Sequence, residues 1–144
     1  MKKSKILYFD DEVATAKSLV NNLCNNFNYD ITFVANIADF LSNLKDGKFG
    51  LLMIDVMAPI PYDLANGVLT SSDLKTMEQE GGLNIGLVLA DKIWKMDGFN
   101  DIPIIFLTAK GDVTLPPGKN CRLIRKPELA KHISNVISEL LKGE

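Results

Sequence analysis

The chain contains short apolar runs and longer stretches in which apolar residues recur three or four positions apart. The short runs have the length of β-strands and cover residues 5–9, 30–34, 51–54, 102–107 and 121–125. The longer stretches predict amphipathic helices over residues 13–27, 37–44, 85–94 and 129–141. Predicted strands and helices therefore follow each other in turn along most of the sequence.

This alternation predicts right-handed βαβ units and a parallel sheet. Runs without a polar residue, such as 51–54 and 104–107, are typical of strands covered by helices on both faces. We therefore predict an α/β fold with a flavodoxin-like, doubly wound, five-stranded parallel sheet in the order 2-1-3-4-5. The 144 residues suit a single domain over 1–144, and no internal repeat or linker interrupts it.

Two segments interrupt the pattern. Residues 56–84 connect the third strand to the next helix, where a loop of roughly two to six residues is usual. Within this insert, residues 71–80 are expected to form a helical turn or two behind a Ser or Asp cap. Residues 110–120 contain Pro116, Pro117 and Gly118, so the helix expected between strands four and five is predicted to be shortened or absent.

Composition narrows the class of protein. The chain is 47% apolar and 24% charged, which is typical of a globular domain, and its net charge of −2 argues against a nucleic-acid-binding surface. No apolar run approaches the roughly 20 residues of a membrane helix. The two cysteines lie far apart and form no zinc-ligand spacing with the single histidine. These features predict a cytoplasmic protein without membrane contact.

Polar residues that can carry chemistry stand where the predicted strands end. Asp10 and Asp11 follow the first strand, Asp55 ends the third, and Thr108 and Lys126 end the fourth and fifth. In a sheet of this order, ligands bind beyond the carboxyl ends of the strands, at the switch point between the first and third strands. The predicted topology therefore gathers these five residues at one rim.

Three carboxylates in one place repel each other, and a hard divalent cation relieves that repulsion. Carboxylate oxygens together with water suit Mg²⁺. A carboxylate can also attack phosphorus and form an aspartyl phosphate. Phosphoryl transfer mainly needs charge neutralisation and positioning, which an ammonium and a hydroxyl group at the same rim can supply.

These motifs resemble those of a response-regulator receiver domain of two-component signalling. The resemblance spans the chain apart from the two interruptions, and its motifs stand in the same order, each at a strand end. They are Asp10-Asp11-Glu12, Asp55, Thr108-Ala109 and Lys126-Pro127.

The resemblance implies a role for each matching residue. Asp55 would accept a phosphoryl group from a histidine kinase or a histidine phosphotransfer protein, and Thr108 and Lys126 would respond to it. Mg²⁺ would be held by Asp10, Asp11, Asp55 and the backbone carbonyl of Met57. The Lys126-Pro127 bond would be cis. The chain would accept one phosphoryl group and lose it slowly, so we do not expect a turnover enzyme.

The chain also departs from the family. Leu123 replaces the usual aromatic residue three positions before the lysine, and we expect it to be buried. The missing fourth helix puts the usual output and dimer face in doubt. The insert 56–84 could shield Asp55, select the kinase or carry the output. Gly86, more than Gly82, matches the family's glycine before the third helix. Because no DNA-binding domain follows, we expect the output to be a partner protein.

Two other functions fit parts of the sequence. A non-phosphorylated pseudo-receiver scaffold would bind a partner through the insert, which Leu123 and the missing helix favour and the complete acidic cluster opposes. A phosphohydrolase resembling the haloacid dehalogenases would use Asp55 as its nucleophile. Those enzymes carry a second Asp two positions later, where this chain has Met57.

Overall fold

Five parallel strands form the centre of the computed structural model, which describes residues 4–63, 67–109 and 111–142. Their order is β2-β1-β3-β4-β5, and every neighbouring pair is parallel. This confirms the predicted sheet. The strands are β1 (Lys5–Phe9), β2 (Asp30–Val34), β3 (Leu51–Asp55), β4 (Ile104–Thr108) and β5 (Cys121–Arg125).

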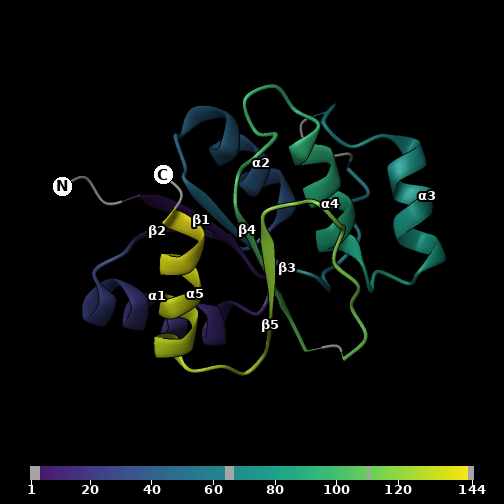
Figure 1. Ribbon diagram of the computed structural model, residues 1–144. Coiled ribbons are helices and arrows are strands. Elements are labelled where there is room, and N and C mark those ends of the chain that lie inside the picture. Colours follow the sequence, from purple (N-terminus) through teal and green to yellow (C-terminus); the bar gives the residue numbers. More distant parts are fainter. Residues whose placement is uncertain (1–3, 64–66, 110, 143–144) are drawn as a thin grey trace.

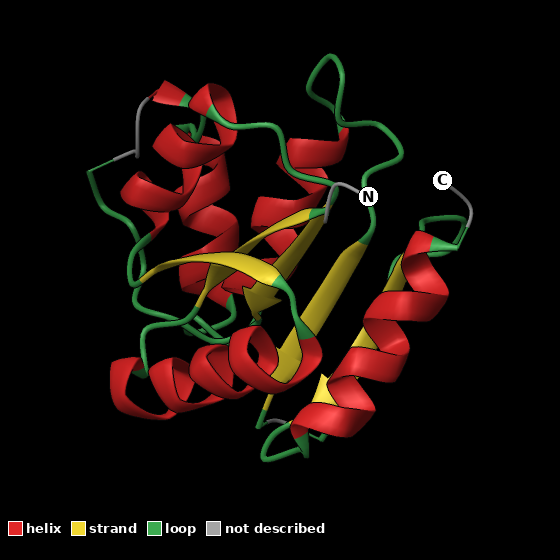
Figure 2. Ribbon diagram, turned by 90° about the vertical axis from the view of Figure 1, so that its left-hand side faces the viewer, coloured by secondary structure: helices red, strands yellow, loops and turns green. Residues whose placement is uncertain are grey.

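Helices cover both faces of the sheet (Figures 1 and 2). Helices α1 (Val13–Phe27) and α5 (Ala130–Leu141) lie on one face, and α2 (Ile37–Asp46) and α4 (Ile85–Trp94) lie on the other. A further helix, α3 (Ser71–Gln79), lies beside α4 at the edge of the molecule (Figure 1). None of the described helices is both long enough and apolar enough to cross a membrane.

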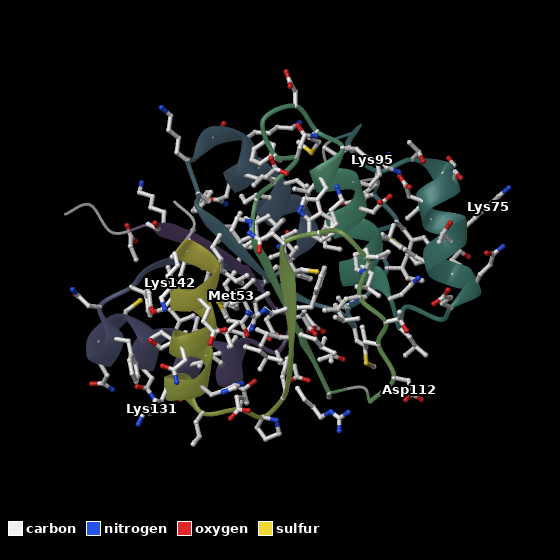
Figure 3. All side chains as sticks on the ribbon, viewed as in Figure 1. Met53, Lys75, Lys95, Asp112, Lys131 and Lys142 are labelled. Atoms are coloured by element: carbon white, nitrogen blue, oxygen red, sulfur yellow. The ribbon has the colours of Figure 1, made fainter. Side chains whose placement is uncertain are left out.

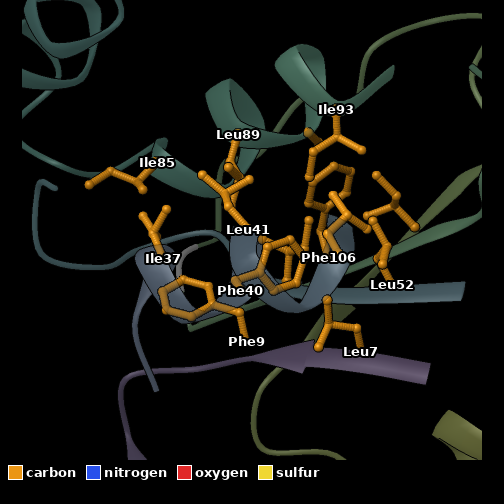
Figure 4. Close-up of a cluster of buried hydrophobic side chains, with 14 of the residues drawn as sticks. Leu7, Phe9, Ile37, Phe40, Leu41, Leu52, Ile85, Leu89, Ile93 and Phe106 are labelled. Atoms are coloured by element: carbon orange, nitrogen blue, oxygen red, sulfur yellow. The ribbon is translucent and has the colours of Figure 1, made fainter. Parts of the chain in front are cut away.

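Side chains that alternate along the strands build a separate apolar core on each face. On β1, Leu7 and Phe9 face α2 and α4, whereas Ile6 and Tyr8 face α1 and α5. Figure 4 shows the first of these cores, in which Phe9 and Phe106 lie among leucine and isoleucine side chains. In Figure 3, Met53 of β3 lies inside the molecule, whereas the lysines of α3 and α5 point outward.

Residues 56–84 contain more regular structure than the sequence predicted. Helix α3 has nine residues, and its cap is Thr70 rather than a Ser or Asp. The Thr70 hydroxyl accepts a hydrogen bond from the Asp73 N–H, and the Asp73 carboxylate accepts one from the Thr70 N–H, which forms a capping box. Met77 is fully buried and anchors α3 to the core. Residues 64–66 of the insert lie outside the described residues.

The connection from β4 to β5 contains no helix within described residues 111–120, which confirms the predicted loss. Val113 and Leu115 of this segment are partly buried against the α2/α4 core instead. Strand β4 begins at Ile104, so the predicted start at residue 102 was wrong. Pro103 has no N–H to donate to a neighbouring strand, which is consistent with the later start.

Candidate functional site

The carboxyl ends of four strands place the predicted site residues at one rim. Short backbone hydrogen bonds hold this rim together. The Lys126 N–H donates to the Thr108 carbonyl at 2.7 Å, and the Val56 N–H donates to the Leu107 carbonyl at 2.9 Å. The Asp10 N–H donates to the Val34 carbonyl at 3.3 Å. Side chains at the strand ends therefore project from a fixed backbone.

Asp10, Asp11 and Asp55 form a compact acidic cluster. Each offers a carboxylate oxygen, and these three oxygens lie within 4.8 Å of one another. Asp10 is 1% exposed and Asp55 is 4% exposed, whereas Asp11 lies at the surface. The cluster therefore has a buried base and an open side formed by Asp11.

Asp10 is the most extensively hydrogen-bonded member of the cluster. Its Oδ1 accepts a hydrogen bond from the Glu12 N–H at 2.9 Å. Its Oδ2 accepts two, from the Tyr8 hydroxyl at 2.7 Å and from the Lys126 ammonium at 2.8 Å. These contacts fix the orientation of a buried carboxylate that would otherwise be costly to remove from water.

Lys126 connects the two buried carboxylates. Its Nζ lies 2.8 Å from Asp10 Oδ2 and 3.5 Å from Asp55 Oδ2. Burial alone would lower the pKa of Lys126, but the hydrogen bond to Asp10 and the charges of Asp55 and Asp10 outweigh this effect and raise it. The ammonium therefore stays charged at neutral pH, within reach of either carboxylate.

Asp55 is held in an environment that disfavours its negative charge. Burial, followed by the neighbouring charge of Asp10, raises the pKa of Asp55 to about 8, although Lys126 acts in the opposite direction. The Met57 N–H lies 3.3 Å from Asp55 Oδ1 and donates to it. A cation among the three carboxylates would favour the ionised form of Asp55.

The donor set fits Mg²⁺. This ion prefers six oxygen ligands at about 2.0–2.1 Å and keeps several waters, so two or three carboxylate oxygens from the protein suffice. The three carboxylate oxygens lie within 4.8 Å of one another, close enough for a single ion to approach all of them. The exposed side of Asp11 leaves room for water ligands.

The structure brings together five of the six side chains or groups predicted for the site. Besides the acidic cluster and Lys126, Thr108 is fully buried at the end of β4. The sixth, the Met57 carbonyl, has no described contact with the cluster, so its part in metal binding stays a prediction. The expected cis bond between Lys126 and Pro127 is confirmed.

Two further expectations about neighbouring residues can be compared with the structure. A side chain on Gly86 would collide with the backbone of Asp55 and Val56, because its Cβ would lie 2.8 Å from Val56 Cα. This close approach explains why the position requires glycine, but Gly86 is the second residue of α4 and does not precede the helix, and its match to the family's glycine stays a prediction. Leu123 is half-buried against the α2/α4 core, so it is less enclosed than the sequence predicted.

Two clefts of about 290 Å³ each border the acidic cluster. The first lies between α1 and the start of α5, and Asp10, Lys126 and apolar side chains such as Leu19 line it. The second lies between Asp11, the start of α2 and the first part of the insert, residues 59–63. The insert therefore reaches the exposed side of the cluster.

Tyr8 is the site residue that the sequence analysis missed. It lies in an apolar strand, and its type alone suggests a core residue. The available signal was its spacing, since residues two apart on a strand face the same side and Tyr8 precedes Asp10 by two.

Solved receiver domains share this architecture. A CheY-like response-regulator receiver domain protein of Methanospirillum hungatei is 18% identical, and the match covers 99% of this chain and 96% of that one at a TM-score of 0.70. The receiver domain of a signal transduction histidine kinase of Syntrophus aciditrophicus is 19% identical, with coverage of 97% and 91% and a TM-score of 0.68.

A chemotaxis response regulator of Vibrio cholerae is 15% identical, with coverage of 97% of this chain and 100% of that one and a TM-score of 0.66. No protein-family model and no curated protein sequence matches the chain. At these identities the likeness concerns the fold, so the chain has the fold of response-regulator receiver domains.

Proposed function

We propose that the protein is a phosphoacceptor receiver in a phosphorelay, and that Asp55 accepts the phosphoryl group in the presence of Mg²⁺. The observation that carries this proposal is the site geometry. Three carboxylates share one small volume, and a charged lysine lies within 3.5 Å of the two buried ones. Burying like charges at this density costs stability, so a purely structural role explains the arrangement poorly.

The proposed step forms one bond and breaks another. An oxygen of ionised Asp55 attacks the phosphorus of a phosphohistidine, a P–O bond forms, and the P–N bond breaks with its electron pair left on the imidazole nitrogen. Mg²⁺, held by Asp10, Asp11, Asp55 and the Met57 carbonyl, would neutralise charge on the transferred group. The Lys126 ammonium supplies a second positive charge from the buried side of the site.

The donor would be a histidine kinase or a histidine phosphotransfer protein. After transfer, the added negative charge at Asp55 attracts Lys126 and the Thr108 hydroxyl and changes the loops that follow β4 and β5. We infer that a partner protein reads this change. A cytoplasmic location stays a prediction from the composition of the sequence.

The proposal is tested by intact-mass analysis of the protein after incubation with acetyl phosphate, with and without Mg²⁺. We expect the mass of one added phosphoryl group on the wild type only when Mg²⁺ is present. Asp55→Asn should abolish this addition, because an amide does not attack phosphorus. Asp101→Asn, at an exposed position before β4, is the matched control and should still accept the group.

A phosphoryl group on Asp55→Asn at the wild-type level would contradict the proposal. If the wild type binds Mg²⁺ but acquires no group from acetyl phosphate or from phosphorylated kinases, the pseudo-receiver scaffold is favoured instead. Two observations support that second function: Leu123 is half-buried, and described residues 111–120 form no helix.

A further inference from the structure

The Tyr8 hydroxyl lies at the buried side of the acidic cluster, against Asp10. Tyr8 is 1% exposed, and its hydroxyl donates to Asp10 Oδ2 at 2.7 Å. The same oxygen accepts the hydrogen bond from Lys126. Tyr8 and Lys126 therefore share one acceptor atom of a buried carboxylate.

The position of this hydroxyl is fixed by the fold. Tyr8 and Asp10 project to the same face of the sheet, and β1 pairs with β2 and β3 on its two sides. The Tyr8 ring meets the Phe33 ring edge-on, with 5.5 Å between centroids. A buried ring held in this way cannot follow Lys126 when the lysine moves.

Phosphorylation would change the contacts of Asp10. The Lys126 Nζ already lies 3.5 Å from Asp55 Oδ2, and in the proposed phosphorylated state it turns toward the phosphoryl group on Asp55. Asp10 Oδ2 then loses its ammonium donor. Without a second donor, this buried carboxylate oxygen would carry a large penalty, and the penalty would hold Lys126 at Asp10.

We propose that Tyr8 is a positioning residue that keeps Asp10 Oδ2 hydrogen-bonded when Lys126 leaves it for the phosphoryl group. The inference rests on the proposed function of Asp55. In the proposed role Tyr8 does not touch Asp55. It affects Asp55 only indirectly, by supporting Asp10 and so freeing Lys126. Its effect should therefore appear when a phosphoryl group, or a group that resembles it, occupies the site.

The test compares the affinity of Tyr8→Phe for Mg²⁺ alone with its affinity for beryllofluoride in the presence of Mg²⁺. Beryllofluoride binds a carboxylate oxygen and stands in for the phosphoryl group. We expect Tyr8→Phe to weaken beryllofluoride binding about tenfold, the size of a lost hydrogen bond to a charged group. Binding of Mg²⁺ alone should change much less, because Lys126 still covers Asp10 in that state.

Tyr29→Phe is the matched control. The Tyr29 hydroxyl also makes hydrogen bonds on the α1/α5 side of the sheet, at 3.2 Å to the Ser134 carbonyl, but it lies away from the acidic cluster. This variant loses a comparable hydroxyl and should retain both affinities. Melting temperatures of all variants without ligand show whether each one folds, and the comparison is repeated at a lower temperature if Tyr8→Phe is partly unfolded.

Two outcomes would overturn the proposed role of Tyr8 and leave the proposed function of Asp55 standing. One is an unchanged beryllofluoride affinity in a folded Tyr8 variant. The other is an equal loss of affinity for Mg²⁺ and beryllofluoride, which a general loosening of β1 would produce. If the wild type binds Mg²⁺ but no beryllofluoride, the proposed function of Asp55 fails, and this result is distinguishable because it concerns the unmodified protein.

Discussion

Asp10 and Asp55 are both buried aspartates, yet their surroundings differ. Asp10 receives hydrogen bonds from Tyr8, Glu12 and Lys126, which compensate its charge. Asp55 accepts a hydrogen bond from the Met57 N–H, but burial and the neighbouring charge of Asp10 raise its pKa to about 8. Asp10 is therefore held in place by several donors, whereas the disfavoured charge of Asp55 would be stabilised by a cation.

The contacts of Lys126 lead to a prediction for the Lys126→Ala variant. Lys126→Ala should retain Mg²⁺ binding, because removing a positive charge beside three carboxylates does not weaken their attraction for a cation. The same variant should lose the stabilisation that beryllofluoride gives to the wild type. Calorimetric titration measures the first quantity, and the shift in melting temperature measures the second.

Lys131→Ala, on the exposed face of α5, is the control for charge alone and should behave like the wild type in both measurements. A large loss of Mg²⁺ affinity in Lys126→Ala would show instead that the lysine organises the acidic cluster itself. The role proposed for Lys126 toward the phosphoryl group would then need to be abandoned.

At the scale of elements, Gly86 links the start of α4 to the backbone beside Asp55, the proposed phosphoacceptor. The Gly86 N–H donates to the Val56 carbonyl at 2.9 Å, and the chain has no room for a Cβ at this position. Gly86→Ala should lower the free energy of unfolding by about 1–3 kcal/mol, the usual cost of overpacking a tight site. It should also reduce phosphorylation, because relief of the collision displaces Asp55.

Urea unfolding tests the predicted stability of Gly86→Ala. Gly111→Ala is the control, since an added Cβ there would meet only the end of the Arg125 side chain, at 3.6 Å. A Gly86→Ala protein with wild-type stability and phosphorylation would show that the backbone of Asp55 shifts at little cost, against the packing argument.

Helix α3 depends on Asp73, which completes the capping box and also lies 3.3 Å from Lys92 of α4. Burial alone would raise the pKa of Asp73, but hydrogen bonds from Thr70 and Lys92 outweigh it and lower the pKa. The ionised form therefore stabilises the folded protein above the usual aspartate pKa of about 3.9, and this contribution is lost as the pH falls through the lowered value.

Asp73→Asn should accordingly cost about 1 kcal/mol of stability at pH 7, the typical value of a cap. The difference from the wild type should shrink as the pH falls below about 4. Urea unfolding across this pH range measures it, with Glu78→Gln on the exposed face of α3 as the control. A difference that does not depend on pH would mean that the charge of Asp73 has no part in capping.

The elements differ in how well the sequence predicted them, and burial explains the difference. The strand 51–55 and the helix 85–94 were found because both are dominated by apolar side chains that enter a core. Helix α3 was underestimated because Met77 is its one fully buried residue, so its stability depends on the Thr70 cap and on contact with α4. Neither feature produces a strong pattern along the chain.

At the scale of the whole molecule, topology predicted most of the site. Residues as distant as Asp10 and Lys126 meet because parallel strands end at one rim, and that rule requires only the strand order. Tyr8 was missed because its role depends on where a hydroxyl lies within the core. The sequence also could not predict that residues 59–63 lie beside Asp11, because no periodic pattern fixes the path of a loop.

Described residues 111–120, between β4 and β5, form no helix, and this changes the surface available to partners. Segment 111–120 uses Val113 and Leu115 to cover the core and offers no regular helical stripe for a second copy. We therefore expect the protein to remain monomeric with Mg²⁺ and beryllofluoride bound, as measured by light scattering over a range of concentrations. A dimer that forms only with beryllofluoride would show that this face still carries the output.

The central claim, that Asp55 is the phosphoacceptor, is tested most directly by locating the phosphoryl group. Borohydride reduces an acyl phosphate to an alcohol, which converts a phosphorylated aspartate into homoserine that peptide mass spectrometry can place in the sequence. After incubation with acetyl phosphate and Mg²⁺, we predict homoserine at position 55 and at no other aspartate, and none when either reagent is omitted. Homoserine at another position, or none in a protein that carries the added phosphoryl mass, would contradict the account.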